Sequence, residues 1–153
     1  MSNGGENGFT LLEMVCVLAL IAMMAAVLLP FIPHQTSRSR LQAYALQTAT
    51  LLKADRNAAI RRGVDVSTLV DTGSRSIRSG ATADMIRIPE DVRFDALLPK
   101  TCNRRAALST ISFFASGMSC GGAIALTRLD AGYEIRVNWL TGRIEIVPHI
   151  ATN

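Results

Sequence analysis

Residues 14–33 read MVCVLALIAMMAAVLLPFIP, a stretch of 20 residues in which 18 are apolar and none is charged. About 20 apolar residues in a helix suffice to cross the hydrocarbon core of a lipid bilayer. A buried core helix is a poor alternative for so long an apolar run in a chain of 153 residues. The sequence has no second run of this kind. It therefore predicts a protein that crosses a membrane once.

The composition around this stretch indicates one folded domain attached to an appendage. Hydrophobic residues make up 49% of the chain, which is too many for a disordered protein. Charged residues make up 18%, which argues against a protein with several membrane crossings. A chain of this length suits one domain, or one domain with an additional segment.

The positive charge is concentrated next to the apolar stretch. Residues 38–62 hold six basic residues and one acidic residue, a net charge of +5 within a total of +4. Residues 1–37 contribute −2, and residues 63–153 contribute +1. A basic segment beside a membrane helix can meet anionic headgroups, whereas a nucleic-acid-binding protein concentrates Lys and Arg on its folded domain. We therefore expect no nucleic-acid partner.

The residues before the apolar stretch do not form an ordinary secretory signal. Residues 1–8, MSNGGENG, contain no Lys or Arg, and no small-residue cleavage site follows the apolar stretch. Glu13 is a lone carboxylate inside the apolar segment that begins at Phe9. A carboxylate at the centre of a membrane helix costs roughly 2.5–3.5 kcal/mol, so its presence indicates a function. The alternative is that Glu13 marks the headgroup boundary.

The segment Gly8-Phe9-Thr10-Leu11-Leu12-Glu13, followed by the apolar stretch, resembles the type III signal of type IV pilins and type II secretion pseudopilins. The resemblance implies that a prepilin peptidase cleaves between Gly8 and Phe9, and that the new N-terminal Phe9 is methylated. It also implies that Glu13 pairs with the free amine of Phe9 in a neighbouring subunit during assembly. Two charges that are each costly in lipid become less so as a close pair. The leader departs from the family because it carries Glu6 and no basic residue.

The chain beyond Pro33 has the pattern of an amphipathic helix that ends near Gly63. Arg61-Arg62-Gly63 places cations in the last turn and a glycine after it, as helix ends do. A continuous helix over residues 9–62 would be about 80 Å long, with a kink or local opening at Pro30 and Pro33. Residues suited to a buried face recur at three- and four-residue spacing: Leu41, Tyr44, Ala45, Thr48, Leu51, Leu52, Asp55, Ala58 and Ala59.

The chain after Gly63 has the pattern of β-strands. Asp130-Ala131-Gly132 and Leu140-Thr141-Gly142 favour hairpin connections. The fold class is therefore α+β, with one long helix packed on an antiparallel sheet. The strands are expected at Val64–Val70, Ile86–Ile88, Val92–Leu97, Ala107–Phe114, Ala123–Leu129, Tyr133–Asn138 and Arg143–Val147.

Three further segments resemble the GspH/FimT-like minor pseudopilins: residues 51–59 (LLKADRNAA), residues 113–122 (FFASGMSCGG) and residues 138–143 (NWLTGR). The resemblance implies a pilin-like fold and the H-type minor subunit of type II secretion. That subunit lies near the tip of a periplasmic pseudopilus, which helps to move folded proteins through an outer-membrane secretin. A minor pilin of a type IV pilus or of a DNA-uptake filament is the alternative.

The resemblance also divides the chain and implies its partners. Residues 1–8 are a cleaved leader, 9–33 the transmembrane half of the helix, 34–62 its amphipathic half and 63–153 a periplasmic β-rich head. The protein is expected in the bacterial inner membrane, crossing it once. Its partners would be other minor and major pseudopilins, the inner-membrane assembly platform, the prepilin peptidase, the secreted substrate and the secretin.

No convergent catalytic or metal-binding set is visible in the sequence. Residues 117–121 (GMSCG) satisfy G-x-S-x-G, but a strand pattern follows them, and a hydrolase elbow requires a strand-to-helix turn. His34 and His149 are too few and too isolated for a metal site. We therefore expect no enzyme activity, no cofactor and no metal.

The three cysteines have different expected roles. Cys16 lies in the apolar stretch and behaves there as a small apolar residue. Cys102 and Cys120 flank an expected strand, and the family orientation would place them in an oxidising periplasm. We predict a Cys102–Cys120 disulfide; the alternative is two separate buried thiols.

Overall fold

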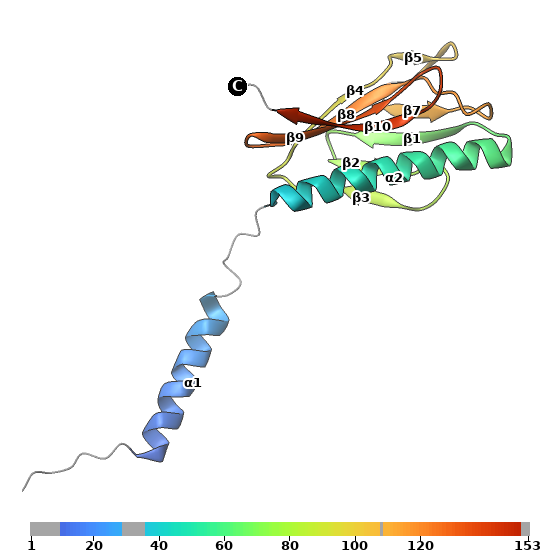
Figure 1. The fold of residues 1–153 in the computed structure, drawn as a ribbon. Coiled ribbons are helices and arrows are strands. Elements are labelled where there is room, and N and C mark those ends of the chain that lie inside the picture. Colours follow the sequence, from blue (N-terminus) through green and yellow to red (C-terminus); the bar gives the residue numbers. More distant parts are fainter. Residues whose placement is uncertain (1–9, 29–35, 108, 151–153) are drawn as a thin grey trace, which may run out of the picture. The chain divides into compact units, whose positions relative to one another are not determined.

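The computed structural model describes residues 10–28, 36–107 and 109–150. The chain divides into two compact units, Met1–Gln35 and Thr36–Asn153, each of which is described by itself. Figure 1 shows the two helices and the strands of the second unit, which we call the head (residues 36–153). The expected cleavage site, Gly8 and Phe9, and residues 29–35 lie outside the described residues.

The first unit contains helix α1, which spans Leu11–Leu28. Thr10 caps its N-terminus, because the Thr10 side-chain oxygen accepts a hydrogen bond from the backbone N–H of Glu13 at 3.3 Å. The side chains from Leu11 to Ala25 are exposed, including that of Cys16. Among the described residues, the structure has no helix that combines the length and the apolar character needed to cross a membrane.

Helix α2 spans Arg38–Arg62 and begins the head. The Ser37 side chain caps it by accepting a hydrogen bond from the Arg40 backbone N–H at 3.2 Å. Gly63 ends it in the left-handed conformation, with φ of 65°, as the sequence predicts. Its buried face follows the predicted stripe and comprises Leu41, Ala45, Thr48, Ala49, Leu51, Leu52, Asp55, Ala58 and Ala59.

The strands of the head form two four-stranded antiparallel sheets and one small hairpin. The first sheet has the order β3 (Met85–Arg87), β2 (Ser76–Arg78), β1 (Val66–Asp71) and β7 (Thr110–Phe113). The second has the order β10 (Ile144–Ile150), β9 (Ala131–Val137), β8 (Gly122–Arg128) and β4 (Arg93–Leu97). The hairpin pairs β5 (Thr101–Cys102) with β6 (Arg105–Ala106).

The sequence predicts one sheet, whereas the structure has two four-stranded sheets. The β7–β8 connection explains this difference. The backbone takes positive φ at Gly117, Gly121 and Gly122. Glycine adopts such angles readily, so the chain turns sharply there, leaves the first sheet and enters the second. Strands β2, β5 and β6 were not expected, because each has only two or three residues and no apolar alternation.

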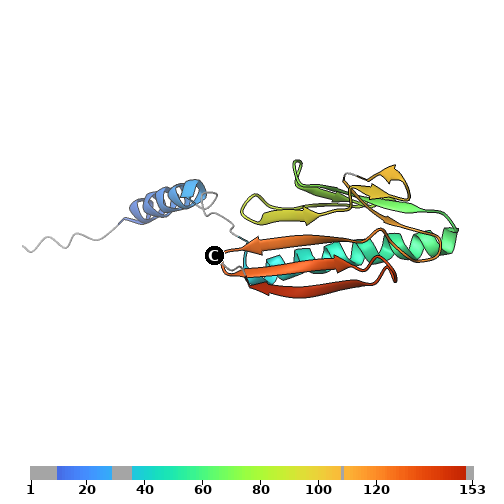
Figure 2. The ribbon, with the colours of Figure 1, turned by 90° about the horizontal axis from the view of Figure 1, so that it is seen from above.

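Helix α2 contacts strands of both sheets and so joins them into one core. Figure 2 shows α2 running along the strands of the head. In the second sheet, Ile135 pairs with Ile124 on one side and with Ile146 on the other, which places apolar side chains in one row. The fully buried side chains of the core include Leu41, Leu52, Val70, Ile77, Ile111, Phe113, Ile124, Leu126 and Ile135.

Candidate functional site

The described part of the N-terminal motif is the first turn of α1. Thr10 and Glu13 have the spacing of a capping box, and Glu13 is the third residue of the helix. The positive end of the helix dipole favours a carboxylate at this position. Glu13 is exposed among exposed apolar side chains. The structure therefore presents one carboxylate in an otherwise apolar surface, where it is available to a charged partner.

The three head segments that resemble the minor pseudopilins meet at Arg56 on α2. The Arg56 Nε atom donates a hydrogen bond to the carbonyl oxygen of Gly117 at 3.0 Å. Its Nη2 atom donates another to the carbonyl oxygen of Thr141 at 3.0 Å. One guanidinium thus ties the helix to the β7–β8 loop and to the β9–β10 turn. We call this arrangement the Arg56 clasp.

The clasp depends on a close approach that only glycine permits. Gly142 has φ of 63°, and a Cβ atom there would lie 2.1 Å from the Gly117 carbonyl oxygen and 2.7 Å from Arg56 Nε. Gly117 has φ of 84° and packs beside Ile60 and Arg56. Gly117 and Gly142 are therefore required by the packing of the two loops on α2.

Asp55, the neighbour of Arg56, is fully buried and contacts the first sheet, at β1 and the β2–β3 loop. Its carboxylate accepts hydrogen bonds from the hydroxyls of Thr68 (2.6 Å) and Ser79. It also accepts hydrogen bonds from the backbone N–H groups of Gly80 (3.0 Å) and Ala81 (3.3 Å). A buried carboxylate requires several donors of this kind, so Asp55 fixes β1 and the β2–β3 loop against α2.

The entry of the chain into the head is fixed by Asp91. The backbone N–H of Thr36 donates to Asp91 Oδ2 at 2.7 Å, and the Thr36 hydroxyl donates to Oδ1 at 2.8 Å. Arg128 pairs with the same carboxylate at 3.0 Å. The hydrogen bonds from Thr36, and then those from Arg128, hold the pKa of Asp91 below its ordinary value.

Cys102 and Cys120 are bonded to each other in the structure. Their Cα atoms lie 5.7 Å apart, and 18 positions separate them in the chain. The bond attaches the β5–β6 hairpin to the β7–β8 loop, which the Arg56 clasp attaches to α2. Each strand of the hairpin has only two residues, so the disulfide adds a covalent link to a short ladder.

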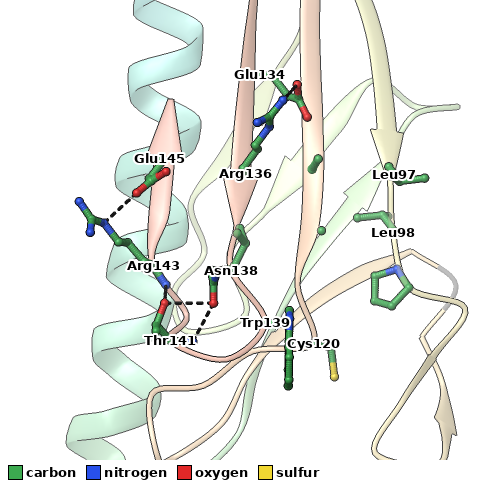
Figure 3. A pocket seen from close by; sticks show the side chains of 14 residues that line it. Leu97, Leu98, Cys120, Glu134, Arg136, Asn138, Trp139, Thr141, Arg143 and Glu145 are labelled. Atoms are coloured by element: carbon green, nitrogen blue, oxygen red, sulfur yellow. Dashed lines mark hydrogen bonds and ion pairs between the residues drawn. The ribbon is translucent and has the colours of Figure 1, made fainter. Parts of the chain in front are cut away.

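A shallow groove with a volume of about 730 Å³ lies beside this disulfide at the end of the second sheet. Figure 3 shows Leu97 and Leu98 on one side, Arg136 and Glu134 on the other, and Trp139 near Cys120. We call it the distal groove. Arg136 pairs with Glu134 at 2.8 Å, and this carboxylate raises the pKa of Arg136.

The G-x-S-x-G segment is a connection between strands. The Ser119 hydroxyl is buried and accepts a hydrogen bond from the Gly121 backbone N–H at 3.0 Å. The Ser119 backbone N–H donates to the carbonyl oxygen of Trp139, which again joins the two loops. His149 lies in β10 opposite Gly132, and His34 is outside the described residues. Across the described ranges, no group of three or more His, Cys, Asp or Glu is arranged to hold a metal ion.

The sequence pattern indicates no role for Arg56 or Asp91, and it places Asp55 on the buried stripe without indicating a partner. The position of Asp55 was itself a signal, because an acid on the apolar face of a helix needs buried donors. The partners of Arg56 lie 61 and 85 positions away, and no local pattern indicates them.

The sequence is similar to a known N-terminal motif and to a protein of the type II secretion system. Residues 4–29 match the family described as the prokaryotic N-terminal methylation motif. The chain is 31% identical over 143 residues to the type II secretion system protein H of Xanthomonas campestris pv. campestris. The match covers 93% of this chain and 83% of that protein.

The fold is similar to solved structures from two kinds of filament system. The minor pseudopilin EpsH from the type 2 secretion system of Vibrio cholerae matches with a TM-score of 0.56 and 12% identity, over 71% of this chain and 96% of that chain. The type IV minor pilin FimU of Pseudomonas aeruginosa matches with a TM-score of 0.56 and 17% identity, over 74% of this chain and 92% of that chain. At these identities the similarity shows the pilin-like fold alone, and the choice between the two systems comes from the sequence. The chain belongs to the type II secretion system protein H family and is a minor pseudopilin.

Proposed function

We propose that this minor pseudopilin is a structural subunit that enters the periplasmic pseudopilus near its tip. In this proposal, the prepilin peptidase cleaves after Gly8, and the mature chain begins with methylated Phe9. The apolar segment crosses the inner membrane once, with the head in the periplasm, until the subunit is incorporated. Its partners are the other pseudopilins and the inner-membrane assembly platform, and the filament acts on the secreted protein at the secretin.

The observation that carries the proposal is the placement of Glu13. It lies in the first turn of α1, four positions after Phe9, with its side chain exposed among apolar ones. An isolated carboxylate in lipid is costly, and a positively charged amine beside it reduces that cost. The amine of Phe9 in a neighbouring subunit would supply that charge, so Glu13 would favour the docked subunit over the free one.

A structural role, without catalysis, is also part of the proposal. The motif that most resembles a nucleophile, around Ser119, has its hydroxyl buried and hydrogen-bonded within its own loop. The polar groups that converge in the head, Asp55 and Arg56, hold backbone segments in place. These contacts support a rigid head whose surface makes contacts with other proteins.

The experiment compares Glu13→Ala with the matched variant Glu6→Ala in a strain that lacks the chromosomal copy. Glu6 lies in the proposed leader, so its substitution leaves the mature subunit unchanged. We expect both variants to be cleaved, Glu13→Ala to be lost from isolated pseudopili with reduced secretion, and Glu6→Ala to behave as the parent does. Normal incorporation of Glu13→Ala would contradict the proposed role of this carboxylate.

A further inference from the structure

The end of the head where α2 terminates exposes large apolar side chains. Leu97 is 78% exposed and Trp139 is 66% exposed, and both line the distal groove. Leu140, next to Trp139, is 55% exposed. The floor of the groove includes Gly122 and Ala123, whose small size leaves room above the sheet. Exposed aromatic side chains beside a groove are typical of protein interaction sites.

The same end of the head carries three exposed basic side chains, and Asp65 is the carboxylate that lines a cavity together with one of them, Arg105. The sequence has no acidic residue between Asp95 and Asp130. Lys100, Arg104 and Arg105 lie in this interval and are exposed, and among the described residues none of the three is in an ion pair. We call residues 100–106 the basic hairpin.

The basic hairpin is adjacent to the distal groove. Lys100 follows Pro99, which lines the groove, and Cys102 is bonded to Cys120, which also lines it. The charged residues on the opposite side of the groove neutralise one another, because Glu134 pairs with Arg136 and Glu145 pairs with Arg143. The net charge beside the groove therefore comes from the hairpin.

The hairpin is held in a fixed shape. Asn103 and Arg104 have positive φ angles of 49° and 61°, which are uncommon for a residue such as arginine. The Ala107 backbone N–H closes the hairpin on the carbonyl oxygen of Lys100 at 3.1 Å. With the disulfide, these contacts hold the cations in place before a partner arrives, which lowers the entropy cost of binding.

We propose that the distal groove and the basic hairpin form a docking site for an extended segment of another protein. The segment carries a large apolar side chain flanked by carboxylates. The apolar side chain packs on Leu97, Ala123 and Trp139, and the carboxylates pair with Lys100, Arg104 and Arg105. The groove has the volume of a site for a few side chains. This site belongs to the head, whereas Glu13 belongs to the first unit, and it adds a second contact to the assembly role.

The test measures the binding of three fluorescein-labelled peptides to the full chain in nonionic detergent, by fluorescence anisotropy at low salt. The first peptide is acidic with one central leucine, the second has serine in place of the leucine, and the third has lysines in place of the carboxylates. We expect the first peptide to bind about tenfold or more tightly than either of the others. Added salt should weaken its binding.

Matched protein variants locate the site. Leu97→Ser is paired with Leu129→Ser, because both leucines are 78% exposed and Leu129 lies in the turn at the other end of β8. Charge reversal of Lys100, Arg104 and Arg105 to Glu is paired with the same reversal of the exposed Arg38, Arg40 and Arg87. We expect the first variant of each pair to weaken binding about tenfold, and the second to leave it unchanged.

Three results would overturn the proposal. One is equal binding of the three peptides, or no binding of the acidic leucine peptide at millimolar concentration. Another is an equal loss of binding in the two members of a variant pair. The third is self-association of the chain that Leu97→Ser abolishes, because it would assign the groove to a second copy. The urea unfolding midpoint of each variant is measured by Trp139 fluorescence. A midpoint equal to that of the parent shows that a loss of binding does not come from a loss of fold.

Discussion

Asp55 lies on the buried face of α2, where a periodic pattern would place an aliphatic side chain. Its carboxylate is the acceptor for two hydroxyls and two backbone N–H groups. Gly80, one of these donors, packs so closely on β1 that a Cβ atom there would lie 2.3 Å from the carbonyl oxygen of Ser67. The carboxylate therefore determines where the β2–β3 loop sits on the helix.

We predict that Asp55→Ala lowers the free energy of unfolding by about 3 kcal/mol, because it leaves buried donors without an acceptor. Urea unfolding of the full chain in detergent, followed by the fluorescence of Trp139, measures the change. Asp130→Ala is the matched control, because Asp130 is exposed, and we expect it to change stability by less than about 0.5 kcal/mol. Equal stability of the two variants would contradict the role of Asp55.

Single residues were predictable from the sequence where a local pattern identifies them. Glu13 stands out because a charge interrupts an apolar run, and Gly63 because a glycine follows two cations at the end of a periodic segment. The contacts of Arg56 and Asp91 were not predictable, because their partners are brought near only by the complete fold.

At the scale of elements, α2 and the two loops at its C-terminal half form one connected unit. Arg56 binds the β7–β8 loop and the β9–β10 turn, and the backbone N–H of Ser119 binds the carbonyl of Trp139 between those loops. Since these loops also line the distal groove, the orientation of the groove depends on the clasp.

We predict that Arg56→Ala destabilises the head by roughly 1–3 kcal/mol, because two charge-assisted hydrogen bonds to carbonyl oxygens are lost. Arg56→Lys should retain only part of the stability that Arg56→Ala loses, because an ammonium group does not reproduce the planar geometry of the guanidinium. Hydrogen exchange of the amides in residues 114–121 and 138–143 measures the effect locally. Arg61→Ala is the control, because Arg61 is exposed, and we expect it to leave the exchange unchanged. Faster exchange in Arg61→Ala without faster exchange in Arg56→Ala would contradict the clasp.

The disulfide is another link between elements, because it attaches the basic hairpin to the β7–β8 loop. We predict that the double variant Cys102→Ser, Cys120→Ser loses roughly 3 kcal/mol of stability, from the chain-entropy effect of opening a loop of this length. Thiol alkylation of the denatured, non-reduced protein gives the companion measurement. Cys16 should be the single reactive cysteine in the parent chain, and labelling at all three cysteines would contradict the bond.

The existence of most elements was predictable, and so were the two hairpin pairings of β8 with β9 and of β9 with β10, which the turn residues indicate. The alternation in residues 133–137 and 144–146 indicates strands with one buried face, and these strands are present in β9 and β10. Alternation does not indicate which strands pair when they lie far apart in the chain. The pairings of β1 with β7 and of β4 with β8, and with them the division into two sheets, therefore required the structure.

For the whole molecule, two carboxylates link stability to pH. Hydrogen bonds from Ser74 hold the pKa of Asp71 below its ordinary value, and those from Thr36 do so for Asp91. A carboxyl with a lowered pKa in the folded state stabilises the fold above its unfolded pKa, and this contribution is lost as the pH falls through the folded pKa.

We therefore predict that the free energy of unfolding decreases as the pH falls below about 4, the ordinary range of Asp. The double variant Asp71→Asn, Asp91→Asn should show a weaker dependence on pH in this range than the parent. Urea titrations at a series of pH values measure the free energy of unfolding of the parent and of the double variant. An unchanged slope in the variant would mean that other groups carry the acid sensitivity.

We proposed above that this minor pseudopilin is made as a precursor and is cleaved to give a new N-terminus for assembly. The most direct test is intact-mass and N-terminal peptide analysis of the protein isolated from the membrane of its native host. We predict a mature chain that begins with N-methylated Phe9, and a Gly8→Val variant that keeps residues 1–8. A wild-type chain that retains Met1–Gly8, or that begins at another residue, would contradict it.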